Sequence, residues 1–432
     1  MQKYVLSELD SGERVISERL AHVRSVAIGF WIGAGSRDEK ADRAGVSHFI
    51  EHLLFKGTAS YSAQQIAEIF DTLGGELNAA TAREYTVVYS RILDAHLETA
   101  LDVMADMILQ PRFDADEMSS EREVVLEEIA MYEDQPQELV HDLIQEATFG
   151  SHPLGRPVIG TADVISSLGR RAITSYHRSM YFPGNVVVAA AGNVQHETLL
   201  RLLNRAQMKA LHAPQPKGPR VRRPLVKAPA PGLRFQRKDT EQYHVCLAAP
   251  GISRSDRRRF AASLLDGILG GSASSRLFQE IREKRGMAYA VYSFASQYTD
   301  TGQMGIYIGT REENLRECLE ITREQISDIA AGNLRPDELE RAKENMKGRI
   351  LLSMESTSNR MSRLGKSLIS DTELLSIERI IAEIEAVEAD ELADLASVLL
   401  APEKLSAAAI GPSEKHFLAA VERVNPELAK AA

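Results

Sequence analysis

The feature that most constrains the fold of this chain is a proline-rich stretch near its middle. Between Leu211 and Arg234, six of the sixteen prolines fall in the segment HAPQPKGPRVRRPLVKAPAPGL. Proline cannot continue a helix and interrupts the hydrogen bonding of a central strand, so neither element can run through this segment. We therefore predict two domains, residues 1–212 and residues 232–432, joined by an extended linker over residues 213–231.

The two halves show a similar order of expected elements. Each half begins with a β-rich run and a helix, continues with an alternating strand and a helix pair joined by a Pro-containing turn, and ends with a strand closing on glycine. The matching segments are 23–31 with 243–249, 45–55 with 259–269, 85–92 with 304–308, and VVVAAAGNV with LSAAAIGPS. Tandem duplication accounts for this order, although any chain that alternates helices and strands would resemble it in part. We predict an α+β fold of two similar domains, each a mixed, mostly antiparallel sheet packed with helices.

Composition excludes several classes of protein. The 432 residues include 51 Lys and Arg against 61 Asp and Glu, and the resulting net charge of −10 is spread along the chain, which disfavours nucleic acid as a main partner. No apolar run approaches the roughly 20 residues that a membrane span needs. The start, MQKYVLSELDSGERVI, has early acidic residues and no apolar core of a signal or transit peptide. Because Cys246 and Cys318 are the only cysteines, we expect a reducing, cytoplasmic location.

The sharpest local motif is HFIEH, within GVSHFIEHLLFKGT. A helix places residues i and i+4 on one face, so His48 and His52 can present two imidazole nitrogens to one metal ion. Glu51 lies beside them, where a general base is expected. The alternative, left open by the motif alone, is a helix whose two histidines are satisfied by backbone or water.

A third ligand is expected in the segment EMSSEREVVLEEIAMYEDQP. On a helix, one face is shared by Glu121, Val124, Val125, Glu128 and Tyr132, whereas Glu123 and Glu127 point elsewhere. Carboxylates on an apolar stripe are costly to bury unless a positive group compensates them. Glu128 is the better third ligand and Glu121 a supporting partner, although an acidic, solvated helix is the alternative. Two His and one Glu leave one position open, as in catalytic zinc sites.

These residues resemble the inverzincin peptidases of the pitrilysin, insulinase and mitochondrial processing peptidase type. The inverted motif is present as His48, Glu51 and His52, and Glu128 follows at the family's spacing for its third zinc ligand. Glu121 matches the family's additional glutamate. The resemblance implies one zinc ion per chain and amide hydrolysis with Glu51 as the general base.

The resemblance continues along the chain. GGELNAATAREYTVVYSRI is similar to the family's substrate-binding strand, in which Asn78 and Ala79 would meet the peptide backbone. GGSASSRLFQEIREKRGMAYAVYS is similar to the loop and helix that precede an Arg/Tyr pair, which implies that Arg282 and Tyr289 assist substrate binding and the developing oxyanion. Without the resemblance, Arg282 is a solvated helix residue, Tyr289 a packing residue, and Asn78 and Thr81 are turn residues. The matching helix of the second half, FAASLLDGIL, has no histidine, so we expect no second metal there.

Length adds an expectation about assembly. Insulinase-like members carry four such domains in one chain, whereas this chain has two, as in one processing-peptidase subunit. Because it carries both the zinc motif and the glycine-rich loop, the resemblance implies a homodimer that encloses a chamber. The expected function is a zinc metalloendopeptidase acting on short or unfolded polypeptides. The alternative is a non-catalytic or partner-dependent subunit of a processing-peptidase-like or core-protein-like complex.

Overall fold

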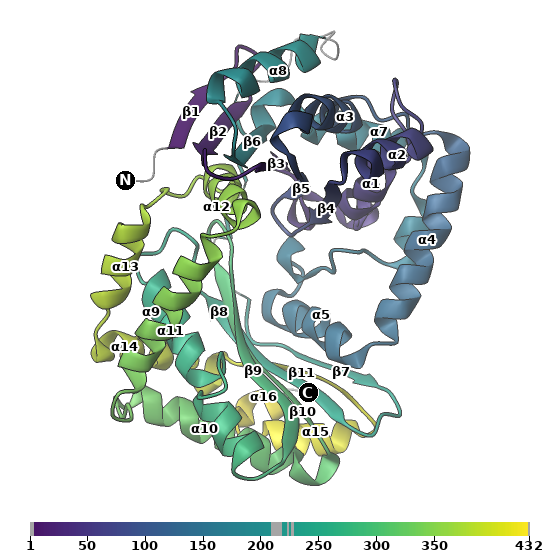
Figure 1. Cartoon of the computed structure of the whole chain (residues 1–432). Coiled ribbons are helices and arrows are strands. Elements are labelled where there is room, and N and C mark those ends of the chain that lie inside the picture. Colours follow the sequence, from purple (N-terminus) through teal and green to yellow (C-terminus); the bar gives the residue numbers. More distant parts are fainter. Residues whose placement is uncertain (1–3, 209–217, 223, 226–228, 431–432) are drawn as a thin grey trace. The chain divides into compact units, whose positions relative to one another are not determined.

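The computed structural model describes residues 4–208, 218–222, 224–225 and 229–430, which divide into two compact units (Figure 1). The first unit comprises Met1–Ala130, Arg156–Arg223 and Leu351–Ser376, and the second comprises Met131–Gly155, Pro224–Ile350 and Ile377–Ala432. Parts of the expected linker, residues 213–217, 223 and 226–228, lie outside the described residues. The domain limits at 212 and 232 stay a prediction about the linear halves, because the compact units exchange segments between those halves.

The first unit is built on a six-stranded mixed sheet with the order β1-β2-β6-β3-β5-β4. Its strands are β1 (Tyr4–Glu8), β2 (Arg14–Arg19), β3 (Ser25–Ile32), β4 (Glu76–Thr81), β5 (Thr86–Leu93) and β6 (Val186–Gly192). The β2 and β6 strands pair in parallel and the other neighbours are antiparallel. Since β4 is last in the order, it is an edge strand.

The second unit is built on a five-stranded sheet with the order β7-β11-β8-β10-β9. Its strands are β7 (Leu233–Arg237), β8 (Tyr243–Gly251), β9 (Ala288–Gln297), β10 (Gly302–Thr310) and β11 (Ser406–Gly411). Here β11 and β7 pair in parallel and the other pairs are antiparallel. This order repeats β2-β6-β3-β5-β4 strand by strand, so the expected fold of two similar α+β domains is confirmed, with β1 as an addition to the first.

Helices follow the strands in both units. The first unit contains α1 (Val46–Leu54), α2 (Ala63–Leu73), α3 (Leu97–Leu109), most of α4 (Ala115–Glu133), α6 (Ala162–Ser167), α7 (Arg170–Met180), α8 (His196–Met208) and α12 (Thr357–Ile369). The second contains α5 (Pro136–Phe149), α9 (Arg259–Leu269), α10 (Glu312–Ala330), most of α11 (Glu338–Ser353), α13 (Ile377–Glu385), α14 (Ala389–Leu399), α15 (Glu414–Val421) and α16 (Pro426–Lys430). No described helix combines the length and the apolarity that crossing a bilayer requires.

Successive residues of a strand point to opposite faces of the sheet. In the central strands both sets of side chains are apolar and buried, so each sheet is covered on both faces. In β3, Ile28 and Phe30 pack with α1, α3 and α7, whereas Ala27 and Trp31 pack against α12. The approach of α12 depends on glycine: a Cβ on Gly365 would lie 2.0 Å from the indole nitrogen of Trp31.

The second sheet is covered in the same way. In β8, Val245 and Leu247 face the helices that follow the strands, and Cys246 and Ala248 face α5 through residues such as Ile144. The helix on the second face is therefore α12 in the first unit and α5 in the second, so each comes from the other half of the chain. The sequence pattern did not predict this exchange.

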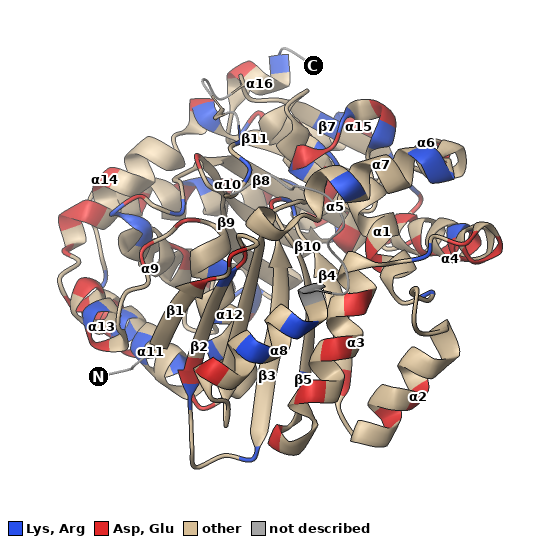
Figure 2. Cartoon of the chain, turned by 90° about the horizontal axis from the view of Figure 1, so that it is seen from above, with Lys and Arg blue, Asp and Glu red and all other residues tan. Residues whose placement is uncertain are grey.

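Charged residues are distributed over the helices (Figure 2). In that view, acidic residues follow α3 and basic residues lie on α8, where Arg205 forms an ion pair of 2.7 Å with Glu98. The mixture of signs agrees with the moderate net charge of −10.

Candidate active site

Helix α1 carries the HFIEH motif and has two different faces. Phe49, Ile50 and Leu53 are buried in the core of the first unit, and the amphipathic pattern therefore turns the two histidines away from it. The rings of His48 and His52 lie 4.7 Å apart, as expected for positions one helical turn apart.

A carboxylate of α4 meets these rings. Glu128 Oε2 lies 3.8 Å from His48 Nε2 and 3.3 Å from His52 Nε2. Ligands about 2.1 Å from a tetrahedral zinc ion are about 3.4 Å apart, so this donor set fits zinc in both chemistry and spacing. Within the described residues it is the one group of three His, Cys, Asp or Glu side chains whose donor atoms all lie within 4.8 Å of one another. The described residues of the second half contain no group of three such donors.

Burial keeps the imidazole of His48 neutral, which is the form that can bind a metal ion. Burial, together with the neighbouring His52, lowers the pKa of His48 to about 4. The ring is therefore neutral near pH 7, and a neutral imidazole has a lone pair available for coordination.

The second imidazole is oriented by Glu121, which is 5 % exposed. His52 Nδ1 lies 2.8 Å from Glu121 Oε1, and the other oxygen of Glu121 accepts a hydrogen bond of 2.6 Å from Lys56 Nζ. Glu121, predicted from the sequence as a supporting partner, thus lies in contact with His52. Lys56 was not anticipated, although its i+4 spacing from His52 is a usable signal. Val124, expected on the same stripe, is instead 51 % exposed.

Glu51 lies between the histidines and the edge strand. The hydroxyl of Thr81 donates a hydrogen bond of 2.5 Å to Glu51 Oε2. Burial raises the pKa of Glu51, and the bond from Thr81 opposes this shift. Thr81 is the last residue of β4 and donates a hydrogen bond to Glu51. From the sequence alone it was interpreted as a turn residue.

The edge strand β4 has an available backbone group. The Ala79 N–H donates to Asn78 Oδ1 at 2.8 Å, so it is not paired with β5 and faces the open edge. The side chain of Asn78 therefore occupies a position that the carbonyl of an added strand could take.

A cavity of about 520 Å³ lies beside β4. Apolar side chains line most of it, including Phe55, Ile66, Phe70 and Leu77, while Asp71 and Glu76 also contribute to the lining. A peptide paired with β4 would have this cavity next to it.

The predicted pair Arg282 and Tyr289 lies in the second unit. The Arg282 guanidinium carbon lies over the Tyr289 ring, 4.7 Å from its centre, and over the Phe278 ring, also 4.7 Å from its centre. Tyr289 is 78 % exposed, and Arg282 belongs to a π-helical segment, Phe278–Glu283. The structure brings the pair together, and Phe278 was not anticipated.

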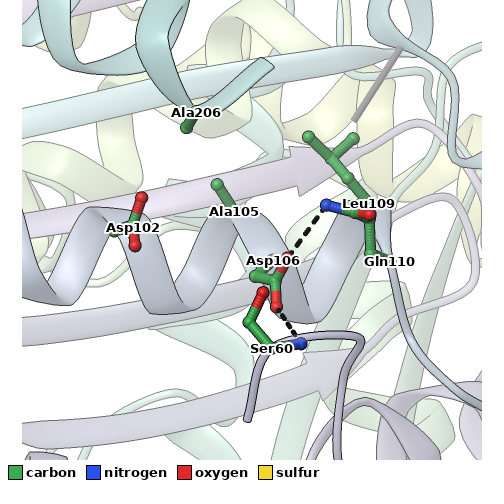
Figure 3. Close-up of a pocket in the computed structure, with 7 residues that line it drawn as sticks. All are labelled: Ser60, Asp102, Ala105, Asp106, Leu109, Gln110 and Ala206. Carbon is green, nitrogen blue, oxygen red and sulfur yellow. Dashed lines mark hydrogen bonds between the residues drawn. The ribbon is translucent and has the colours of Figure 1, made fainter. Parts of the chain in front are cut away.

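A second, smaller pocket lies between α3 and the loop before α2 (Figure 3). Its carboxylates have internal partners: Asp106 accepts hydrogen bonds from Thr58, from the Ser60 N–H and from Gln110, and Tyr61 donates to Asp102. These bonds explain the acidic cluster without a ligand.

Comparisons with known proteins show the family of this chain. Residues 14–162 match the model of the insulinase family, peptidase family M16, and residues 167–346 match that of the peptidase M16 inactive domain. The chain belongs to the M16 peptidase family. An uncharacterized zinc protease of Streptomyces coelicolor is 43 % identical over 94 % of this chain and 88 % of its own length. One from Bacillus subtilis is 40 % identical over 93 % of this chain and 97 % of its own. M16 membership and these names support a zinc peptidase.

Solved structures agree on the fold. A protease from Helicobacter pylori has a TM-score of 0.89 at 22 % identity and covers 95 % of this chain and 100 % of its own. A peptidase M16 inactive domain from Pseudomonas fluorescens has a TM-score of 0.85 at 23 % identity over 95 % of this chain and 98 % of its own. These structures share the fold, and the family models and relatives above confirm the resemblance to M16 peptidases drawn from the sequence.

Glu121→Gln should weaken zinc binding at this M16 site. The amide presents either an N–H group to His52 or an N–H group to Lys56, so one of the two hydrogen bonds is lost. Partners that orient metal-binding histidines typically contribute 10- to 100-fold in affinity, and we expect a dissociation constant about tenfold higher, measured by chelator competition. Glu123→Gln, an exposed change on the same helix, is the control, and equal affinities for both variants would contradict the orienting role.

Proposed function

We propose that this chain is a zinc metalloendopeptidase that hydrolyses short or unfolded polypeptides inside the chamber of a homodimer. The observation that carries the proposal is the convergence of His48, His52 and Glu128 donor atoms within 4.8 Å, with the carboxylate of Glu51 beside them. Two histidines and one glutamate are a donor set typical of catalytic zinc, one ion per chain.

Substrate binds as an added strand on β4. An extended peptide can pair with the free edge, where the Ala79 N–H is bonded only to the Asn78 side chain. Main-chain hydrogen bonds then supply affinity with little dependence on sequence. A folded protein rarely offers such a segment, and this supports short or unfolded polypeptides as the substrate class.

Selectivity comes from the cavity beside β4. Its lining by Phe55, Ile66, Phe70 and Leu77 favours a large apolar side chain of the substrate, because burial of such a side chain is favourable by about 1.5–3 kcal/mol.

Proton transfer is the work of Glu51. Zinc, when bound, polarises a substrate carbonyl and lowers the pKa of water. Thr81 bonds to the carboxylate of Glu51 and so orients it to accept the proton of the attacking water. The raised pKa makes this carboxylate a stronger base and allows it to return the proton to the leaving amine. Arg282 and Tyr289 position the substrate and stabilise the developing oxyanion.

A homodimer and a cytoplasmic location complete the proposal. The two-domain length and the presence of both functional segments in one chain support two equivalent sites. Cys246 and Cys318 are buried and unbridged, in keeping with a reducing compartment.

Glu51→Gln should abolish hydrolysis without releasing the metal. The amide keeps the shape and the bond from Thr81 but cannot accept a proton, so kcat should fall roughly 100- to 10,000-fold. A quenched peptide-library digest with zinc content measured in parallel tests this. Equal cleavage by both proteins would refute the general-base role, and a wild type that binds zinc without cleaving any peptide would favour the non-catalytic subunit.

Ala79→Pro should raise KM with little change in stability. Proline removes an N–H group that faces the open edge, where proline is tolerated, and a peptide hydrogen bond contributes about 1 kcal/mol. We expect KM for unstructured peptides to rise about fivefold, measured by steady-state kinetics together with thermal unfolding. Ala79→Ser retains the N–H and should behave as wild type. If the proline variant also kept the wild-type KM, strand addition at this position would be wrong.

Mixing Glu51→Gln with Arg282→Ala subunits should restore activity if Arg282 and Tyr289 of one subunit act on the substrate at the zinc site of the other. Each mixed dimer then contains one intact site, so random exchange of equal amounts should recover about a quarter of the wild-type rate. The rate is measured after subunit exchange, with each variant alone as the baseline. No recovery in a mixture shown to contain mixed dimers would reject the cross-subunit assignment.

A further inference from the structure

Glu39 is a buried carboxylate with no part in the mechanism above. It is 4 % exposed, and its oxygens accept hydrogen bonds of 2.7 Å from the Gly45 N–H and 2.7 Å from the Ser47 N–H. Gly45 is the N-cap of α1 and Ser47 lies in its first turn. The carboxylate therefore binds the beginning of the helix that carries His48 and His52.

Helix α1 needs a cap from elsewhere because its own N-cap residue cannot supply one. The first N–H groups of a helix lack partners within the helix, and Ser, Thr, Asp or Asn at the N-cap usually bonds them. Gly45 has φ +95°, and a Cβ there would lie 2.7 Å from the carbonyl oxygen of Ile159. Both the conformation and the close approach exclude the usual capping residues. Glu39 replaces them, because its two carboxylate oxygens accept the bonds from the Gly45 and Ser47 N–H groups.

The carboxylate belongs to a buried polar chain. The Ser47 hydroxyl bonds to Glu39 and lies 2.9 Å from the Tyr176 hydroxyl, and Arg156 donates to the Glu39 carbonyl at 2.8 Å. Burial raises the pKa of Glu39 to about 7, although the backbone N–H bonds oppose the shift. Keeping this carboxylate buried is therefore costly, and its hydrogen bonds to α1 are what offset the cost.

The two histidines differ in what holds them. His52 Nδ1 is bonded to Glu121, whereas His48 Nδ1 is buried and has no hydrogen-bond partner among the described residues. The position of the His48 ring thus depends on the backbone of the first turn and on packing. His48 directly follows Ser47, whose N–H is held by Glu39.

We propose that Glu39 is a positioning residue of the metal site: by holding the first turn of α1, it sets the place of His48 relative to His52 and Glu128. The proposal rests on the proposed function in taking these three residues as the zinc ligands. It concerns the affinity and geometry of the site rather than the chemical step.

Glu39→Gln tests the proposal. The amide can accept only through its oxygen, so one of the two N–H groups of α1 loses its partner. We expect the zinc dissociation constant, measured by chelator competition, to rise about tenfold. The visible absorption of the cobalt-loaded protein should shift, and kcat should fall with KM unchanged. Glu18→Gln is the matched control, because Glu18 is also a buried carboxylate of the first unit and pairs with Arg360 on the far side of the sheet from β4. It should lower the melting temperature and leave zinc affinity within about twofold.

The outcomes separate the two proposals. A wild type that binds no zinc would overturn both. A wild type that binds zinc, with an unchanged dissociation constant and cobalt spectrum in Glu39→Gln, would overturn the positioning role alone. If Glu39→Gln does not fold, Tyr176→Phe removes the hydroxyl at the other end of the same chain with little loss of packing. In that variant a two- to threefold weaker zinc affinity supports the proposal, and an unchanged affinity refutes it.

Discussion

Both sheets have central strands that are buried on their two faces, and each sheet must therefore be covered twice. Every residue of β6 is buried, and the two sides of β3 pack against different helices. One face is covered by helices that follow the strands in sequence. The other receives α12 or α5, and the glycine at 365 allows α12 to approach Trp31 closely. The sheet that results supports α1 on one face and has β4 at its edge.

The metal site builds on that support. The apolar side of α1 is fixed in the core, so the opposite side can hold two imidazoles at a partly buried position. Helix α4 brings two carboxylates with different tasks: Glu128 meets both Nε2 atoms, while Glu121 lies between His52 and Lys56. The charge of Glu121 is thus compensated within the site by the ion pair with Lys56.

Much of this was accessible from the sequence. The helix expected at 45–55 is Val46–Leu54, and that expected at 259–269 is Arg259–Leu269. The i, i+4 spacing indicated that His48 and His52 share a face, and Glu128 was one candidate third ligand that the resemblance to the family then favoured. Lys56, Thr81 and Phe278 were missed, because a lysine, a threonine or a phenylalanine acquires its role from a neighbour that is distant in sequence or in the next turn, and single residues of these types have many other uses.

The sequence by itself determined the repeat of two α+β halves, the helix that carries HFIEH, the acidic helix that follows it and the resemblance to the family. The repeat and the two helices depend on local periodicity and spacing, which a linear chain displays directly, whereas the family followed from the resemblance of the motifs. Only the tertiary structure decided that α5 and α12 exchange between the halves and that Glu39 caps a helix whose own N-cap is glycine. Both depend on which buried faces and which unpaired N–H groups remain after the sheets have formed. A helix or side chain that the fold brings near covers the exposed sheet face or accepts the bond from the unpaired N–H group. No local sequence pattern predicts which helix or side chain this is.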